Sequence, residues 1–306
     1  VGDRMVDGRI GTENLNIYQA LAEGGVGAIL TGFTLVDDRE KVLLPIFNLG
    51  DDAYLEDHLK LTDVVHAKGG KIFSQLVFFG SHDFKELQKT IEPGLSSYEM
   101  VAPSSFRRED LGFTPREVTL LEIKAIQEKH AQAAQRAKKA GYDGVELHGA
   151  HGFFLSQFMS PHFNCRTDAY GGSSEKRGTM ALETYRMIRD AVGPDFPILM
   201  KVNVREKYPD GVILDEVVEL AKKLAQEKID GIEISGNWID LNDKDGAIFL
   251  KEGTLIAKEA ATKVILTGGI RERKQMESIL NETKIEFFGL ARPLMKDPNF
   301  LKHLIF

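Results

Sequence analysis

The chain has 306 residues, 42% of them hydrophobic and 28% charged, with a formal net charge of −7 at pH 7. This length suits one large core and is usual for a (β/α)8 barrel, so we expect one domain over residues 1–306. The acidic balance leaves no basic surface for a phosphate backbone, which makes nucleic acid a poor partner. Cys165 is the single cysteine and cannot form an internal disulfide. No N-terminal apolar segment resembles a signal peptide or a membrane span, so we expect a cytoplasmic protein without a membrane partner.

Helical and strand-like segments alternate along most of the chain. Residues 1–12 are polar and rich in glycine and predict a loop. Buried apolar runs predict seven strands, at residues 26–30, 71–76, 145–147, 197–202, 231–235, 263–266 and 286–290. Amphipathic spacing predicts helices at residues 13–23, 56–67, 120–140, 176–191, 214–228, 250–262 and 273–280. This alternation indicates an α/β fold with a parallel sheet and the helices outside it.

The predicted helix at residues 120–140 carries a histidine on its apolar face. The helix begins with a capping box formed by Thr119 and Glu122. Its spacing places Ile126, His130 and Ala133 on one side, so we expect His130 to pack in or near the core as a neutral imidazole without a catalytic role. The stretch before this helix, residues 77–118, has no sustained period, and irregular segments of that length are usually functional or mobile.

Two histidines follow the predicted strand at residues 145–147. His148 and His151 come just past its carboxyl end, where the enzymes built on α/β barrels carry their catalytic groups. A zinc site would need further ligands such as His162 and Cys165. Four ligands within eighteen residues would have to wrap around an apolar segment, so we expect no metal site.

The most specific part of the sequence is HGAHGFFLSQFMSP at residues 148–161, followed by NCRTDAYGG at residues 164–172. It resembles the signature of the Old Yellow Enzyme family, the FMN-dependent ene-reductases also called NADH:flavin oxidoreductases. The resemblance covers nearly the whole chain. It implies a TIM (β/α)8 barrel that binds FMN without a covalent link, takes electrons from NADPH or NADH, and passes hydride to an electron-poor small molecule such as an activated alkene or a quinone.

The family normally has one strand that this sequence does not supply. That strand precedes the first helix and lies under the flavin. We therefore expect a barrel with its first strand missing, which would expose two sheet edges.

Glycine-containing turns follow the predicted strands at residues 263–266 and 286–290. In many barrels the loops at these two positions bind a phosphate through backbone N–H groups, although tight βα turns need no ligand. The resemblance assigns them to the FMN phosphate, with cofactor-binding residues Gly268, Gly269, Ala291 and Arg292. Ala291 stands where the family often has glycine.

Three more residues match flavin contacts of the family. Lys201, at a strand exit, matches a cation that stabilises the negative charge of the reduced flavin, but it could equally be a solvated charge or a Schiff-base nucleophile. Gln75 matches a glutamine that hydrogen-bonds the ring, and otherwise is a polar residue closing a strand. Gly32 matches a position whose main chain approaches the ring, although glycine after a strand needs no ligand.

The resemblance gives His148 and His151 a catalytic and substrate-binding role, as donors to a carbonyl or nitro oxygen of the acceptor. Phe153 is a substrate-binding position where the family usually has a tyrosine that protonates the acceptor's α-carbon. Because phenylalanine has no proton to give, we expect slow saturation of simple enones and less effect on quinones. Phe153 can at the same time pack against Phe154 and Phe158.

The segment RTDAYGG at residues 166–172 is also typical of the family. We expect it to be mainly structural, with Arg166 and Asp168 paired inside it and Gly171 and Gly172 in a turn.

Two other functions stay open from the sequence. A non-redox phosphate-sugar lyase or isomerase could use Lys201 with the same phosphate loops, but it would not explain the paired histidines or Gln75. A degenerate flavin-binding scaffold would fit the missing strand and Phe153. The oligomeric state is open, and a homo-oligomer is compatible with the sequence.

Overall fold

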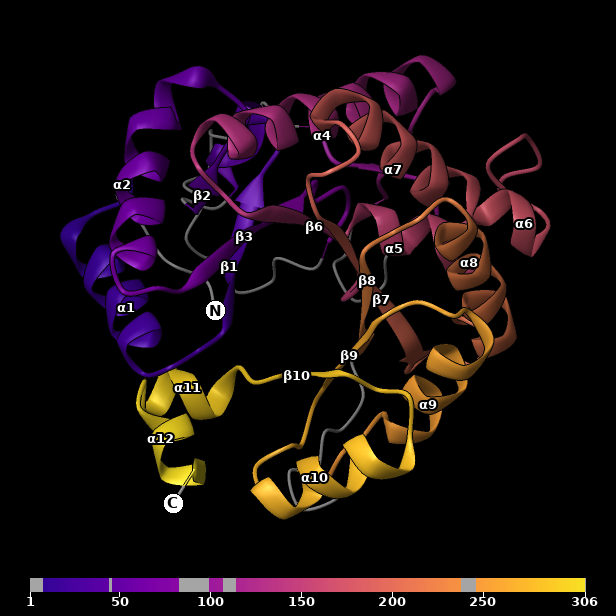
Figure 1. Cartoon of the computed structure of the whole chain (residues 1–306). Helices are drawn as coiled ribbons and strands as arrows, with labels where there is room; N and C mark the ends of the chain where they lie inside the picture. The colour runs from indigo at the N-terminus through magenta and orange to yellow at the C-terminus, as the bar shows by residue number, and fades with distance from the viewer. Residues whose placement is uncertain (1–7, 44–45, 83–98, 107–113, 238–245, 306) are drawn as a thin grey trace.

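The structure is a computed structural model that describes residues 8–43, 46–82, 99–106, 114–237 and 246–305. Its parallel sheet has eight strands in the order β10-β9-β8-β7-β6-β3-β1-β2. These strands are β1 (Ala28–Leu35), β2 (Phe47–Asn48), β3 (Lys71–Val77), β6 (Gly144–Gly149), β7 (Ile198–Glu206), β8 (Gly231–Asn237), β9 (Val264–Thr267) and β10 (Phe287–Gly289). Figure 1 shows the sheet curled at the centre with helices around it.

The helices form the outer layer of the barrel. They are α1 (Thr12–Glu23), α2 (Leu55–His66), α4 (Leu120–Lys139), α5 (Phe154–Met159), α6 (Ser174–Arg177), α7 (Thr179–Val192), α8 (Leu214–Gln226), α9 (Leu250–Glu259), α10 (Arg273–Glu282), α11 (Arg292–Lys296) and α12 (Phe300–Ile305). Two 3-10 turns, Asp38–Val42 and Asp52–Tyr54, and a small pair of strands, β4 (Val101–Ala102) and β5 (Arg116–Glu117), complete the described elements. No helix in the described ranges is long and apolar enough to cross a membrane.

All seven predicted strands are present, and every pairing in the sheet is parallel. The predicted end of the first strand at Thr31 and Gly32 is wrong. The register shifts between Leu30 and Phe33, and β1 continues to Leu35. Gly32 therefore lies inside the strand, and its N–H donates to the Tyr18 hydroxyl at 3.0 Å.

The sheet is not closed by hydrogen bonds among the described strands. β1 pairs with β3 along its length and with β2 only at Thr34 and Leu35, and the partner of β10 is β9. The helices nonetheless complete the ring, because the segment between α11 and α12 lies against the end of α1 (Figure 1). The backbones of the two segments are in close contact, because a Cβ added to Gly24 would lie 1.9 Å from the carbonyl oxygen of Pro298.

Two aspartates link the amino ends of neighbouring strands by hydrogen bonds. Asp143, just before β6, accepts the N–H of Ile72 at 2.9 Å and donates its own N–H to the Ile72 carbonyl at 2.9 Å. Asp230, just before β8, makes the same two contacts with Ile198, at 2.8 and 3.1 Å. This end of a barrel contributes stability, whereas chemistry is carried at the carboxyl ends of the strands.

The prediction for α4 is confirmed. Thr119 and Glu122 cap the helix reciprocally, with N–H to side-chain distances of 3.2 and 2.8 Å. His130 is fully buried, and its Nδ1 donates to the Ile126 carbonyl at 2.8 Å. Burial lowers the pKa of His130 to about 4, so the imidazole is neutral at pH 7.

The buried histidines predict loss of stability in mild acid. The pKa of His58 and of His130 falls to about 4 through burial, whereas an unfolded histidine titrates near 6.5. As the pH falls from about 7 to 4, the unfolded state therefore binds protons that the folded state does not. The free energy of unfolding therefore falls as the pH is lowered. Between pH 7 and pH 5 it should fall by about 2 kcal/mol less in His130→Leu than in the unchanged protein.

Urea unfolding at several pH values measures this effect. The control is His303→Gln on α12, because His303 is exposed. A pH dependence as steep in His130→Leu as in the unchanged protein would contradict the prediction.

Candidate active site

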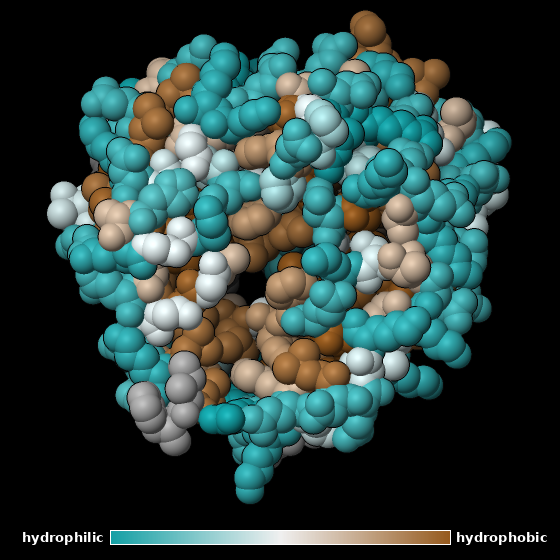
Figure 2. Space-filling view, viewed as in Figure 1, coloured by the Kyte–Doolittle hydropathy of each residue, from teal (hydrophilic) through white to brown (hydrophobic). Residues whose placement is uncertain are grey.

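Side chains from neighbouring strands converge inside the barrel near the carboxyl ends. Alternate residues of a strand share one face, and the strand register places His148 beside Lys201 and Lys201 beside Glu233. The inward-facing polar residues are Gln75 on β3, Glu146 and His148 on β6, Lys201 and Asn203 on β7, Glu233 and Ser235 on β8, and Thr267 on β9. Figure 2 shows one face of the molecule hollowed near its centre, with apolar residues around the hollow.

Lys201 lies inside β7, five residues before its end, so the prediction that it stands at a strand exit is wrong. Its side chain belongs to a cluster of charged groups inside the barrel. Its Nζ is 2.8 Å from Glu233 Oε1, which also accepts the Thr267 hydroxyl at 2.6 Å. Next to them, Gln75 Nε2 donates to Glu146 Oε2 at 2.5 Å. Glu146 is fully buried and Glu233 is 4% exposed, so this lysine is not the solvated charge that one interpretation of the sequence allowed.

The cluster holds one negative and one positive charge. Burial, together with the neighbouring Glu233 carboxylate, raises the pKa of Glu146 well above its ordinary value, so Glu146 keeps its proton. Burial would also raise the pKa of Glu233, but the Lys201 ammonium outweighs it and the pKa is lowered. Burial would lower the pKa of Lys201, but the Glu233 carboxylate outweighs it and the pKa is raised. Lys201 is thus a fixed cation.

His148 is a buried imidazole with one nitrogen available to a ligand. It lies within β6, one residue before the strand ends, so the prediction that it comes just past the strand is wrong. Its Nδ1 accepts the N–H of Ala150 at 3.3 Å, which leaves the proton on Nε2. Nε2 has no hydrogen-bond partner among the described residues. Burial and the neighbouring His151 lower the pKa of His148 well below its ordinary value, so the ring is neutral.

His151 is held from two strands in an uncommon backbone conformation. Its φ of 60° is in the left-handed region, which few non-glycine residues adopt. Its N–H donates to Asn203 Oδ1 at 3.0 Å, and its Nε2 is 2.6 Å from the Ser235 hydroxyl. Burial and the Lys201 charge lower the pKa of His151 to about 3. The two imidazole rings are 5.0 Å apart, edge to face.

Phe153 packs beside the histidine pair in a second apolar cluster. Its ring lies 4.6 Å from that of His148 and 4.9 Å from that of Phe33, and it stacks on His82 at 4.0 Å. The prediction that Phe153 packs is confirmed, but its expected partners are wrong. Phe154 and Phe158 belong to the main core, whereas Phe153 belongs to the cluster with Phe79.

The turn after β9 requires glycine. Gly268 and Gly269 have φ values of 106° and 76°, and a Cβ on Gly269 would lie 1.5 Å from the Gly246 carbonyl oxygen. Ala291 and Arg292 are exposed at the start of α11. These four residues lie at the ends of the adjacent strands β9 and β10, as the sequence predicts.

The segment at residues 166–172 has the structural role that the sequence predicts. Arg166 is 7% exposed and binds both carboxylate oxygens of Asp168 at 2.6 to 3.1 Å. It also donates to the carbonyls of Pro103 and Val118, both at 2.8 Å, and so holds the loop that carries β4 and β5.

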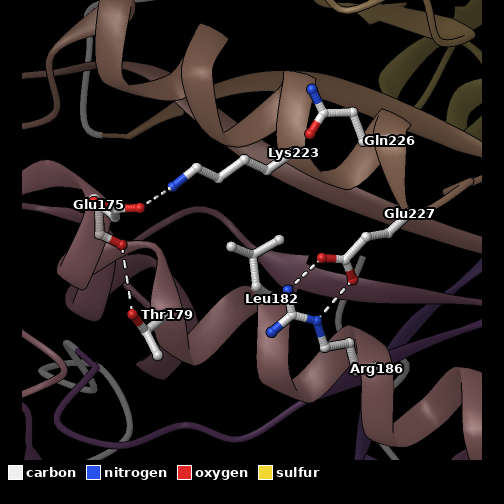
Figure 3. Close-up of a pocket in the computed structure, with 7 residues that line it drawn as sticks. All are labelled: Glu175, Thr179, Leu182, Arg186, Lys223, Gln226 and Glu227. Atoms are coloured by element: carbon white, nitrogen blue, oxygen red, sulfur yellow. Dashed lines mark hydrogen bonds and ion pairs between the residues drawn. The ribbon is translucent and has the colours of Figure 1, made fainter.

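A separate surface pocket lies among α6, α7 and α8 (Figure 3). Its charged groups are paired with one another: Lys223 with Glu175 at 2.8 Å, and Arg186 Nε with Glu227 at 2.8 Å. The pocket belongs to the outer helical layer, and none of the sequence-predicted site residues lines it.

Sequence reasoning missed five residues of the site. These are Glu146, Asn203, Glu233, Ser235 and Thr267. A signal was present, because glutamates inside the apolar runs VELH and IEIS are uncommon in buried strands unless they are paired.

The glycine turn gives a prediction about stability. Gly193 has a φ of 83° with no atom within 4 Å of an added Cβ, so Gly193→Ala adds only backbone strain. Gly269→Ala also places a side chain at a positive φ and adds a collision with Gly246. We expect Gly269→Ala to cost about 2 kcal/mol more than Gly193→Ala because of this collision, a Tm lower by about 3 °C. Thermal unfolding of both variants without added ligand measures this, and equal Tm values would contradict the close approach.

Comparison with known proteins identifies the family. The model of the NADH:flavin oxidoreductase / NADH oxidase family matches residues 4–305. The chain belongs to this family, and the resemblance to Old Yellow Enzymes is confirmed.

Individual relatives agree with this assignment. The chain is 35% identical over 306 residues to an NADH oxidase of Thermoanaerobacter brockii, covering 97% of this chain and 46% of the relative. It is 30% identical over 300 residues to an NADPH dehydrogenase of Bacillus velezensis, covering 97% of this chain and 84% of the relative. The chain thus spans less than half the length of the first of these proteins.

The solved structures show the fold. The old yellow enzyme homologue from Zymomonas mobilis superimposes with a TM-score of 0.83 at 22% identity, covering 100% of this chain and 86% of the other. The α/β TIM-barrel prediction is confirmed at this level.

Proposed function

We propose that this chain is an FMN-dependent NAD(P)H oxidoreductase that reduces electron-poor small molecules such as activated alkenes or quinones. The observation that carries the proposal is His148 Nε2, a buried N–H donor without a partner among the described residues, beside a second neutral imidazole at the strand ends. A buried donor of this kind needs an acceptor oxygen, because an unsatisfied polar group costs free energy. The family membership and the relatives' names support the same reaction class.

The residues at the strand ends fit the cofactor. Gly269 has no room for a side chain and Gly268 has a φ of 106°, so this turn exposes backbone N–H groups that could bind a phosphate, with Ala291 and Arg292 at the next strand end. Lys201 supplies a buried positive charge. When bound, FMN would accept hydride from NADH or NADPH and pass it to the second substrate.

The histidine pair would bind the second substrate. His148 donates from Nε2 to a carbonyl, nitro or quinone oxygen. His151 adds a second contact if Ser235 gives up its hydrogen bond to the ring. Both rings are neutral because their pKa values are lowered, so they polarise the substrate as hydrogen-bond donors and not as imidazolium cations. Gln75 uses one N–H of Nε2 for Glu146 and would meet the cofactor through its second N–H or its Oε1, and Gly32, whose N–H is bound to Tyr18, would approach it through other main-chain atoms.

The structure gives less support to a lyase that uses Lys201. A Schiff-base lyase needs a neutral lysine, whereas the Glu233 carboxylate raises the pKa of Lys201. We also propose that a further parallel strand completes the barrel between β1 and β10. Residues 28–30 of β1 and all of β10 each have one paired neighbour among the described strands.

The experiment that tests the function is an anaerobic visible spectrum of the purified protein, loaded with FMN if necessary. NADPH or NADH should bleach the flavin band, and an enone or quinone should restore it. His148→Ala should leave the bleaching unchanged and slow the return by about 10²-fold, the usual effect of losing one donor to a developing oxyanion.

The matched control is His162→Gln, which changes a histidine of the same segment that binds Asp210. A protein that neither contains nor takes up FMN would contradict the proposal. So would equal rates of return in His148→Ala and the unchanged protein.

Phe153 gives a prediction about substrate preference. Its ring lies 4.6 Å from that of His148 and has no hydroxyl group that could donate a proton. Enone saturation requires a proton on carbon, whereas a quinone is protonated on oxygen. Phe153→Tyr should therefore raise enone turnover by about 10²-fold, within the usual range of general acid catalysis, and change quinone turnover little. Steady-state rates with both acceptors measure this, and equal enone rates in the two proteins would refute the role.

A further inference from the structure

Glu233 is the charged partner of Lys201. Lys201 Nζ lies 2.8 Å from the Glu233 carboxylate; Glu233 is buried, and the Lys201 side chain is 13% exposed. A lysine that stabilises a reduced flavin is most effective when its charge is uncompensated. Here a full negative charge lies in contact with it.

Packing holds the Glu233 carboxylate in place. Thr267 donates to Oε1 at 2.6 Å from β9. On β10, a Cβ added to Gly289 would lie 2.0 Å from Thr267 Oγ1 and 3.3 Å from Glu233 Oε1, so the backbone of β10 closes over both groups. The carboxylate therefore cannot swing away from Lys201 without disturbing two further strands.

We propose that Glu233 is a positioning residue that fixes Lys201 Nζ, offsets its charge, and thereby lowers the reduction potential of the flavin bound beside it. The inference rests on the proposed function, because it takes Lys201 to lie next to the cofactor. A charge separated from the flavin by one side chain in a dry interior acts at low dielectric, so removing it has a measurable effect.

The charges of the other nearby groups leave this role to Glu233. Glu146 is hydrogen-bonded to Gln75 and keeps its proton, and His148 and His151 are neutral. Replacing Glu233 with glutamine keeps the side-chain size and an oxygen for Thr267 but removes the negative charge. Replacing Glu146 with glutamine exchanges one neutral group for another and is the matched control.

The test is the midpoint potential of the FMN-loaded protein, measured anaerobically against reference dyes. Xanthine oxidation supplies the two electrons and the medium the protons, so flavin and dye are reduced together. Glu233→Gln should raise the ratio of reduced to oxidised flavin at least tenfold at a given dye ratio, a shift of about 30 mV for two electrons. In Glu146→Gln the ratio of reduced to oxidised flavin should stay within threefold of that in the unchanged protein. Glu233→Asp keeps the negative charge, so its ratio should also stay within threefold.

A second comparison remains available if Glu233→Gln does not fold. The double variant Lys201→Gln with Glu233→Gln removes both charges together, and its ratio of reduced to oxidised flavin should stay within threefold of that of the unchanged protein, because the ion pair has no net charge. Replacing both members of a buried ion pair is often tolerated.

The outcomes separate the two proposals. A protein that takes up no FMN refutes the proposed function, and this inference with it. If FMN binds and its potential in Glu233→Gln equals that in the unchanged protein, only the role of Glu233 is refuted. The same holds if Glu146→Gln shifts the potential as much as Glu233→Gln does. A double variant whose ratio of reduced to oxidised flavin falls at least tenfold below that of the unchanged protein refutes it as well, because the Lys201 charge would then act on the flavin without being offset.

Discussion

The centre of this barrel is governed by the cost of taking charge out of water. One ammonium and two carboxyl groups lie inside the sheet, and each alone would lose several kcal/mol of hydration. They are accommodated because Lys201 and Glu233 pair directly while Glu146 keeps its proton. The strand register follows from this arrangement, since a shift of one residue in β7 or β8 would turn one charge toward the helices and leave the other unpaired.

Much of the fold could be predicted from the sequence, because buried strands and amphipathic helices have different periods. The differences arise where local pattern carries no information. β2 is two residues long, too short to show a period, and α5 is a six-residue helix buried on every side, so it has no polar face. Thr31 and Gly32 resemble a strand end, but pairing with β3 carries β1 past them, which is a tertiary effect.

The site was predictable only in part, for a related reason. Family motifs and strand ends indicate His148, His151 and Lys201, which are near one another in the structure. Their supporting residues lie within strands or on other strands, so no motif joins them. Asn203 and Ser235 are 52 and 84 positions from His151 and become its neighbours only when β6, β7 and β8 pair.

The aspartate contacts at the opposite end of the barrel bear on how the molecule opens. Asp143 ties β3 to β6, and Asp230 ties β7 to β8, each through a side-chain and a backbone hydrogen bond. Native proteins open in cooperative units that often coincide with supersecondary motifs. In amide exchange, β3 with β6 and β7 with β8 should therefore open as two-strand units. β10, with one paired neighbour among the described strands and with Phe287 46% exposed, should exchange before either.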